Sequence, residues 1–144
     1  MNDPPIERRR GEFVVTTDRT RIDPNAALQL LRTTHWGGGM DRAVLTRALA
    51  NSISFGLFQG DRLIGFGRAV TDMATYAYWT DVVIAESFRG RGLGRWLSEC
   101  MLGHPQLQNL RRVALLTRDA QELYAGLGFT EGSQPLIYME HRPT

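Results

Sequence analysis

The sequence contains no lysine, and all 17 of its basic residues are arginine. This absence excludes several kinds of chemistry at once. No side chain can form a Schiff base or act as a lysine nucleophile. The lysine that ends the phosphate-binding loop of nucleoside-triphosphate hydrolases is missing as well. The chemistry of the chain must therefore rest on other residue types.

Cysteine, excess charge and long apolar runs are also scarce. A single cysteine, Cys100, cannot form an internal disulfide, and three scattered histidines offer no metal-ligand spacing. The 17 basic residues stand against 15 acidic ones, so the formal charge of +2 is too weak to favour a nucleic acid or a membrane surface as partner. No apolar run near either end has the length of a signal peptide or a transmembrane helix. We therefore expect a soluble, cytoplasmic protein that binds no metal.

The 144 residues fit one domain of ordinary size. Residues 1–11 lack apolar periodicity, so we expect a mobile leader there and a single domain over 12–144. Apolar patterns, glycines and prolines divide this domain into strands and helices. The expected strands cover 12–17, 54–59, 62–70, 76–84, 113–116 and 136–141. The expected helices begin at Pro24 behind the capping residue Asp23, at 40 (to 51), at 93 (ending before Pro105) and at 120 (to 127). This order indicates a mixed α/β sheet flanked by helices.

The most informative segment is the turn Arg89-Gly90-Arg91-Gly92-Leu93-Gly94, which joins the strand at 76–84 to the helix beginning near Leu93. Its alternate glycines let the backbone approach a ligand and point N–H groups at it. The helix N-terminus adds its positive dipole end. Arg89, Arg91 and Arg95 add three guanidinium groups, which suit phosphate oxygens. The turn therefore predicts an anion site whose natural occupant is a pyrophosphate.

Spacing distinguishes this turn from two other phosphate loops. A dinucleotide fingerprint requires G-x-G-x-x-G, but the third glycine position is occupied by Arg95. The G-K-[ST] ending of the P-loop is absent. A plain solvated Arg-Gly turn remains as the alternative, and the position between an apolar strand and an amphipathic helix disfavours it.

The turn matches the [Q/R]-x-x-G-x-[G/A] motif of the GNAT superfamily of acyltransferases. Asp81-Val82-Val83-Ile84 resembles the fourth strand of that family, and Leu123-Tyr124-Ala125-Gly126-Leu127-Gly128-Phe129 resembles its L-Y-x-x-L-G-F segment. The resemblance covers roughly residues 12–141 and implies the GNAT fold, with about six to seven strands flanked by four helices. Two positions depart from the pattern. Glu86 replaces a frequent proline, and Thr117 replaces an asparagine that touches the pantetheine arm.

The resemblance implies an N-acetyltransferase that moves the acetyl group of acetyl-CoA to a primary amine by direct attack. The pantetheine arm would lie between the fourth and fifth strands, which splay apart to admit it. The implied coenzyme A contacts are Val82, Val83, Ile84, Arg89, Gly90, Arg91, Gly92, Leu93, Gly94 and Thr117. A backbone N–H near Val83 would polarise the thioester. Tyr124 is the implied general acid for the thiolate, although a tyrosine at this position also suits a core role.

Asp81 is the first candidate for accepting the proton of the attacking amine, because a carboxylate in a largely apolar strand requires a reason. Pairing with an arginine is the structural alternative. Glu86 and His35 are weaker candidates for the base. His35 and Trp36 fall in the loop between the first two helices, and we expect them to select the acceptor.

The nature of the acceptor and of any partner is less constrained. A small-molecule amine is favoured over a peptide or protein amine, because no dense acidic pocket is evident. An acyl-CoA sensor without turnover would keep the turn but would not need Tyr124. A nucleic-acid binder is disfavoured by the weak charge and by the lack of aromatic residues among the arginines at 89–95. A homodimer formed through terminal strands stays open.

Overall fold

A computed structural model describes residues 4–34, 39–132 and 136–143 of the chain. Within these residues six strands form one sheet in the order β1-β2-β3-β4-β5-β6. Neighbouring strands are antiparallel except β5 and β6, which run parallel. The strands are β1 Glu7–Arg10, β2 Phe13–Thr16, β3 Ile53–Gln59, β4 Arg62–Thr71, β5 Tyr76–Ile84 and β6 Arg112–Leu115.

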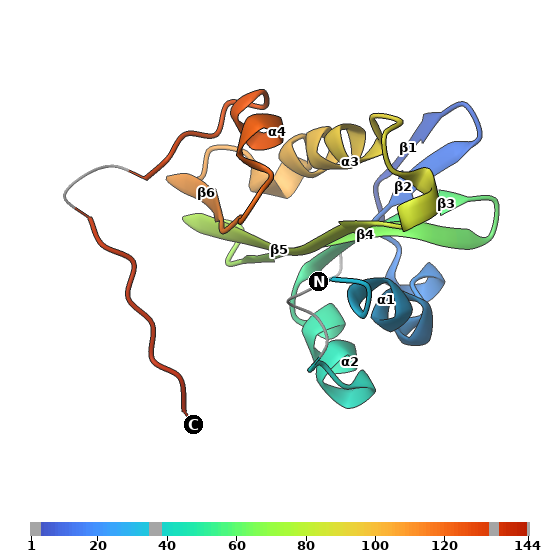
Figure 1. Ribbon diagram of the computed structural model, residues 1–144, viewed down its shortest axis with the longest axis horizontal. Helices are drawn as coiled ribbons and strands as arrows, with labels where there is room; N and C mark the ends of the chain where they lie inside the picture. The colour runs from blue at the N-terminus through green and yellow to red at the C-terminus, as the bar shows by residue number, and fades with distance from the viewer. Residues whose placement is uncertain (1–3, 35–38, 133–135, 144) are drawn as a thin grey trace.

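Four α-helices of the described residues cover the two faces of the sheet (Figure 1). One face carries α1, Pro24–Leu31, and α2, Arg42–Ala50. The other carries α3, Leu93–Leu102, and α4, Gln121–Ala125. Three short 3-10 turns connect the larger elements: η1 Arg19–Arg21, η2 Glu86–Phe88 and η3 Pro105–Leu107. The mixed α/β architecture expected from the sequence is confirmed.

The first two helices begin where short polar side chains can satisfy their free N–H groups. Asp23 accepts a hydrogen bond from the N–H of Asn25 at 2.9 Å, and Pro24 occupies the first helical position, as predicted. Asp41 caps α2 by accepting from the N–H of Val44 at 2.8 Å. The third helix differs, because Gly92 precedes it and offers no side-chain cap. No side chain among the described residues therefore caps the N-terminus of α3, and its first turn contains no acidic residue.

Each face of the sheet has its own apolar core. The core under α3 includes the fully buried side chains of Phe55, Trp79, Leu97 and Met101. The core under α1 and α2 includes those of Leu31, Leu45 and Phe66. Gly67 lets α3 approach β4, because a Cβ at this position would lie 3.0 Å from the Met101 sulfur. No helix in the described part of the chain is long and apolar enough to cross a membrane.

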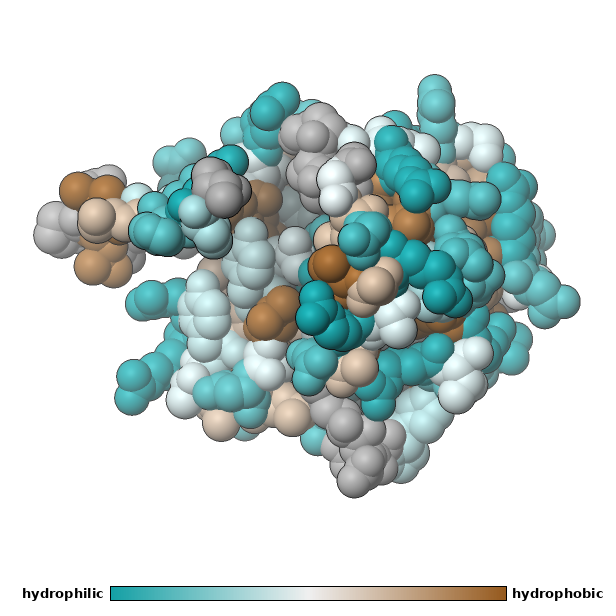
Figure 2. Space-filling view, turned by 90° about the horizontal axis from the view of Figure 1, so that it is seen from below, coloured by the Kyte–Doolittle hydropathy of each residue, from teal (hydrophilic) through white to brown (hydrophobic). Residues whose placement is uncertain are grey.

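Two predictions for the ends of the chain are wrong. Residues 7–10 of the expected mobile leader form β1, which pairs with β2 across a turn at Gly11, where φ is 59°. The expected strand over 136–141 is not formed, and residues 136–143 lead away from the sheet (Figure 1). Apolar side chains stand out on this projecting segment (Figure 2), and Leu136, Ile137 and Met139 are 66%, 81% and 86% exposed. A strand requires a neighbour for its backbone groups, so a suitable local pattern does not suffice. The other elements are confirmed, with small shifts at their ends.

Candidate active site

The sheet opens along one side of β5. Strands β5 and β6 pair only from Tyr76 with Arg112 to Trp79 with Leu115, whereas β5 continues to Ile84. Beyond Trp79 this side of β5 has no partner strand among the described residues. Strands β5 and β6 correspond to the fourth and fifth strands expected from the sequence, because β1 was not among the expected strands. The expected separation of these two strands is present, immediately before the glycine turn.

The pairing with β4 determines which backbone groups face this open side. Ala85 donates its N–H to the carbonyl of Ile64 at 2.7 Å. Opposed pairs in an antiparallel ladder are alternately hydrogen-bonded and non-hydrogen-bonded. After Ala85, the pair of Gly65 and Ile84 therefore exchanges no hydrogen bonds, and the following pair, Phe66 and Val83, exchanges them. The N–H and C=O of Val83 therefore point toward β4, and they are unavailable to a ligand on the open side.

The neighbours of Val83 present their backbone groups to the open side instead. Ile84 lies one step beyond Val83, so its N–H and C=O point away from β4. Its carbonyl accepts a hydrogen bond from Arg89 Nε at 3.0 Å, which leaves the N–H as the free group. The same alternation turns the N–H of Val82 outward. Val82 and Ile84 are therefore the backbone donors near Val83 that a ligand can reach.

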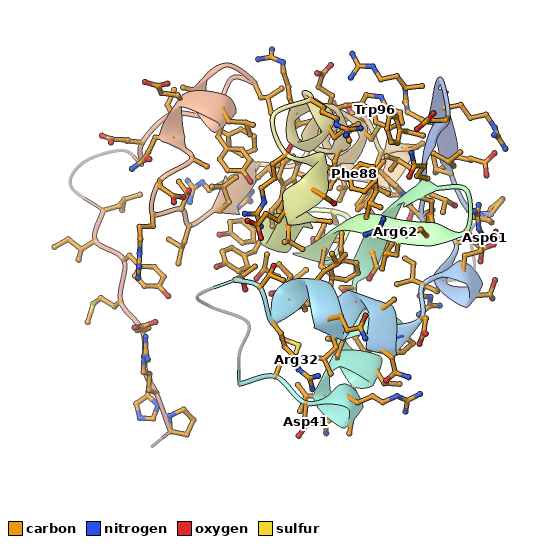
Figure 3. All side chains as sticks on the ribbon, turned by 45° about the vertical axis from the view of Figure 1, so that its right-hand side comes forward. Arg32, Asp41, Asp61, Arg62, Phe88 and Trp96 are labelled. Atoms are coloured by element: carbon orange, nitrogen blue, oxygen red, sulfur yellow. The ribbon has the colours of Figure 1, made fainter. Side chains whose placement is uncertain are left out.

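The glycine turn continues from this edge into α3. Gly90 and Gly92 have φ values of 78° and 76°, in the left-handed region that favours glycine. Gly92 forms the N-cap of α3 without a side-chain cap, so the first N–H groups of the helix are open to an anion. Arg91 lies 5.0 Å from the centre of the ring of Phe88, a residue labelled in Figure 3. The turn has the geometry that an anion site requires.

A hollow of about 620 Å³ lies between this turn and the turn that joins β1 to β2. Arg10, Arg91 and Arg95 line it together with the acidic Glu12 and Glu99. Arg10 also lies 5.7 Å from the ring of Trp96, a residue of α3 labelled in Figure 3. Sequence reasoning missed Arg10, because it placed this residue in a mobile leader.

Tyr124 projects from α4 into an aromatic cluster. Its ring lies 5.6 Å from that of Phe129, which in turn lies 5.2 Å from that of Trp79 on β5. Burial raises the pKa of the Tyr124 hydroxyl above its usual range. No hydrogen-bond partner of this hydroxyl exists among the residues that the structure describes. Arg95 Nη2 donates to the carbonyl of Gly126 at 3.2 Å and so connects α3 to the end of α4.

Asp81 forms a buried ion pair. Nε and Nη2 of Arg68 donate to its Oδ2 at 3.0 and 2.8 Å, and the side chains of Arg68 and Asp81 are 10% and 4% exposed, respectively. The arginine pairing that the sequence left as an alternative is therefore present. Sequence reasoning did not identify Arg68, because it lies 13 positions away on another strand.

The remaining candidates are less tightly integrated. Thr117 Oγ1 accepts a hydrogen bond from the N–H of Ala120 at 3.0 Å, so its hydroxyl supports the approach to α4. Glu86 begins η2. His35 and Trp36 lie outside the described residues. Within the described residues, groups of three or more His, Cys, Asp or Glu side chains that would hold a metal ion are absent.

The sequence and the fold both resemble acetyltransferases. Residues 50–131 match the family described as the acetyltransferase (GNAT) domain. A protein of Gibberella zeae that is named as an acetyltransferase is 33% identical over 139 residues, which cover 80% of this chain and 77% of that protein. These two matches concern most of the chain.

Solved structures show the same similarity. A GNAT-family protein from Xanthomonas campestris pv. campestris superposes with a TM-score of 0.85 at 37% identity, covering 90% of this chain and 92% of its own. A Mycobacterium tuberculosis protein solved with coenzyme A shares the fold, with a TM-score of 0.70 at 23% identity over 85% of this chain and 75% of its own. The chain belongs to the GNAT family and is an acetyl-CoA-dependent acetyltransferase.

Proposed function

We propose that the protein transfers the acetyl group of acetyl-CoA to a primary amine by direct attack. The observation that carries this proposal is the open side of β5, which ends directly at the uncapped N-terminus of α3. In this arrangement the pantetheine arm pairs with the β5 backbone, and the pyrophosphate lies against the glycine turn. Arg89 and Arg91 supply positive charge there, next to a turn without an acidic side chain.

The thioester carbonyl lies at the open side of β5 in this proposal. The N–H groups of Val82 and Ile84 point to that side, and either one is suited to donate to the carbonyl oxygen. As the amine nitrogen attacks the carbonyl carbon, negative charge develops on this oxygen. One well-placed donor contributes about 3 to 4 kcal/mol to the stability of such a transition state. Collapse of the tetrahedral intermediate then breaks the C–S bond and releases the thiolate.

Tyr124 is proposed to give the thiolate its proton. Burial raises the pKa of its hydroxyl, so the group is protonated at neutral pH and available as an acid. The hydroxyl also has no competing partner among the described residues. A binding module that only senses acyl-CoA would not need such a group, so Tyr124 favours turnover over sensing.

The proton of the attacking amine is proposed to pass to water. Asp81 was the first candidate, but Arg68 donates two hydrogen bonds to its Oδ2. This oxygen is therefore already engaged by the guanidinium group. Asp81 is also almost entirely buried. We therefore assign it a structural role and leave the acceptance of the proton to solvent.

The acceptor is proposed to be a small-molecule amine, with a peptide or protein amine as the second candidate. The hollow beside the glycine turn is lined by three arginines, Arg10, Arg91 and Arg95, against Glu12 and Glu99, so it does not favour a polycation. The selection of the acceptor by His35 and Trp36 remains part of this proposal.

Calorimetry with acetyl-CoA, followed by thiol-release assays on a panel of small amines and short peptides, tests the function. We expect binding at about 10–100 µM, within the usual range of KM values, and turnover with at least one amine. Absence of binding in this range would contradict the proposal. Binding without turnover on any amine would favour the sensor instead.

A further inference from the structure

Strand β5 contains a bulge at its boundary with the open side. The register with β4 runs from Phe66 opposite Val83 to Arg68 opposite Thr80, so two residues of β5 stand against one residue of β4. The extra residue is Asp81, whose φ of 60° lies in the left-handed region. A residue other than glycine adopts this conformation uncommonly. The bulge is therefore a local departure that the surrounding structure has to maintain.

The bulge reverses the alternation of the strand beyond it. Before the bulge, Ala77 and Trp79 pack into the core under α3. After it, Val82 and Ile84 face that same core, and Val83 packs under α1 and α2. A regular strand would exchange these two sets, since one step of register moves every side chain to the other face.

The same reversal applies to the backbone. With the bulge, the N–H groups of Val82 and Ile84 point to the open side, while that of Val83 bonds toward β4. Without it, Val83 would face the open side instead. The conformation at Asp81 thus decides which donors meet a ligand that lies along β5.

A buried polar trio holds the bulge in place. Arg68, which faces the strand just before the bulge, gives two hydrogen bonds to Asp81 Oδ2 at 3.0 and 2.8 Å. Its Nη1 donates to Ser52 Oγ at 3.4 Å, and that hydroxyl donates to the carbonyl of Ala48 at 2.5 Å. Ala48 belongs to the last turn of α2. The trio therefore connects α2, β4 and β5 on the face opposite α3.

We propose that Arg68 and Asp81 are positioning residues that fix the β5 bulge, and with it the set of backbone N–H groups presented to the pantetheine arm. This inference rests on the proposed function, in which that edge of β5 binds the cosubstrate. It makes Asp81 act through the backbone of its own strand. Ser52 supports the pair by holding one end of the guanidinium group.

The test compares Asp81→Asn, Arg68→Gln and the double variant with the wild-type protein. Calorimetry gives the Kd for coenzyme A, and steady-state assays give kcat, KM and the pH profile. We expect both single variants to lose about tenfold in affinity, equal to about 1.4 kcal/mol. The double variant should stay within about twofold of them, because coupled residues are not additive. Glu7→Gln is the control, since Glu7 lies on β1 at the far edge of the sheet and the change removes only its exposed ion pairs with Arg9 and Arg21.

A role in proton transfer gives a different pattern. Asp81→Asn alone would then lose kcat and change the pH profile, with an unchanged Kd for coenzyme A, and Arg68→Gln would keep kcat. That result would overturn the proposal. Unchanged affinity in both single variants, with wild-type binding intact, would overturn it equally.

Variants of a buried pair can fail to fold, and Ser52→Ala provides a milder test. It leaves the pair in place but frees Arg68 Nη1, so we expect a two- to threefold loss of affinity, about 0.4–0.7 kcal/mol. Amide hydrogen exchange at Val83 should also accelerate in the ligand-free protein. If neither changes, the trio does not hold the bulge. The exchange measurement needs no ligand, so it separates failure of this inference from failure of the proposed function, which wild-type binding reports.

Discussion

Tyr124 combines a half-buried ring with a hydroxyl that has no partner among the described residues. If this hydroxyl protonates the departing thiolate, Tyr124→Phe should lower kcat by roughly 10² or more, the lower range for a lost general acid. The affinity for acetyl-CoA should change little, because the ring and its contact with Phe129 remain. Steady-state kinetics and calorimetry measure the two quantities. Tyr76→Phe, an exposed tyrosine at the other end of β5, is the control, and an unchanged kcat in Tyr124→Phe would remove Tyr124 from the mechanism.

The pH dependence at this residue follows from burial. Burial raises the pKa of the Tyr124 hydroxyl above the ordinary value of 10.0, so the acid form persists into alkaline solution. A group with a raised pKa in the folded state also stabilises the fold below its ordinary pKa, and this contribution is lost as the pH rises through the folded value. We expect the midpoint of the alkaline decline in kcat at saturating amine to lie above pH 10. A decline near neutral pH that disappears in Tyr124→Phe would contradict this expectation.

At the scale of the element, the start of α3 depends on the backbone conformation of one glycine. Gly92 has a φ of 76°, and a Cβ there would meet no atom within 4 Å, so Gly92→Ala introduces only backbone strain. We expect a loss of about 1–2 kcal/mol in the free energy of unfolding, measured by chemical denaturation. The Kd for acetyl-CoA should rise as well, because the N–H groups of the turn would move.

Gly60 offers a matched control for this prediction. It lies in the turn between β3 and β4, beside the Asp61 labelled in Figure 3, with a φ of 59° and equally open surroundings. Gly60→Ala should lose similar stability and leave the Kd unchanged. Equal losses of affinity in both variants would show that the effect is global instability rather than a change in the turn.

The elements that could be predicted from the sequence are those with local causes. Asp23 starts α1 by accepting a hydrogen bond from the N–H of Asn25, and Pro24 has no N–H to satisfy. The glycines of the turn indicate its left-handed positions. The boundaries of β4 and β5 follow from alternation between clear turn residues. All of these depend on a few consecutive positions.

The features that could not be predicted depend on distant partners. Strand β1 exists because residues 7–10 meet β2, and the segment over 136–141 meets no strand. The bulge at Asp81 is also non-local, since its conformation depends on Arg68 of β4. The sequence indicated only that a carboxylate in an apolar strand requires a reason. It left the choice between proton transfer and pairing open, and it could not show that the Val83 N–H points to β4.

At the scale of the whole molecule, the C-terminal segment and the edge strand β6 both present surfaces that have no partner among the described residues. Leu136, Ile137 and Met139 are exposed, and among the described residues β6 pairs only with β5. Exposed apolar side chains and open strand edges favour association. We therefore expect a homodimer at high protein concentration, measured by sedimentation. Ile137→Asp should weaken this dimer, and His141→Asp, which adds the same side chain to a polar position of the segment, should not. A monomer at all concentrations would contradict the expectation.

The gap between β5 and β6 also links the lifetime of the protein to its cosubstrate. A ligand that binds only the folded chain stabilises it by RT ln(1 + [L]/Kd), about 2.7 kcal/mol at a concentration of 100 Kd. That is a large share of the 5–15 kcal/mol typical of a domain. If acetyl-CoA binds at this edge as proposed, we expect the unfolded population to rise when the cosubstrate is scarce. We then expect proteases that cleave unfolded chains to remove the protein faster.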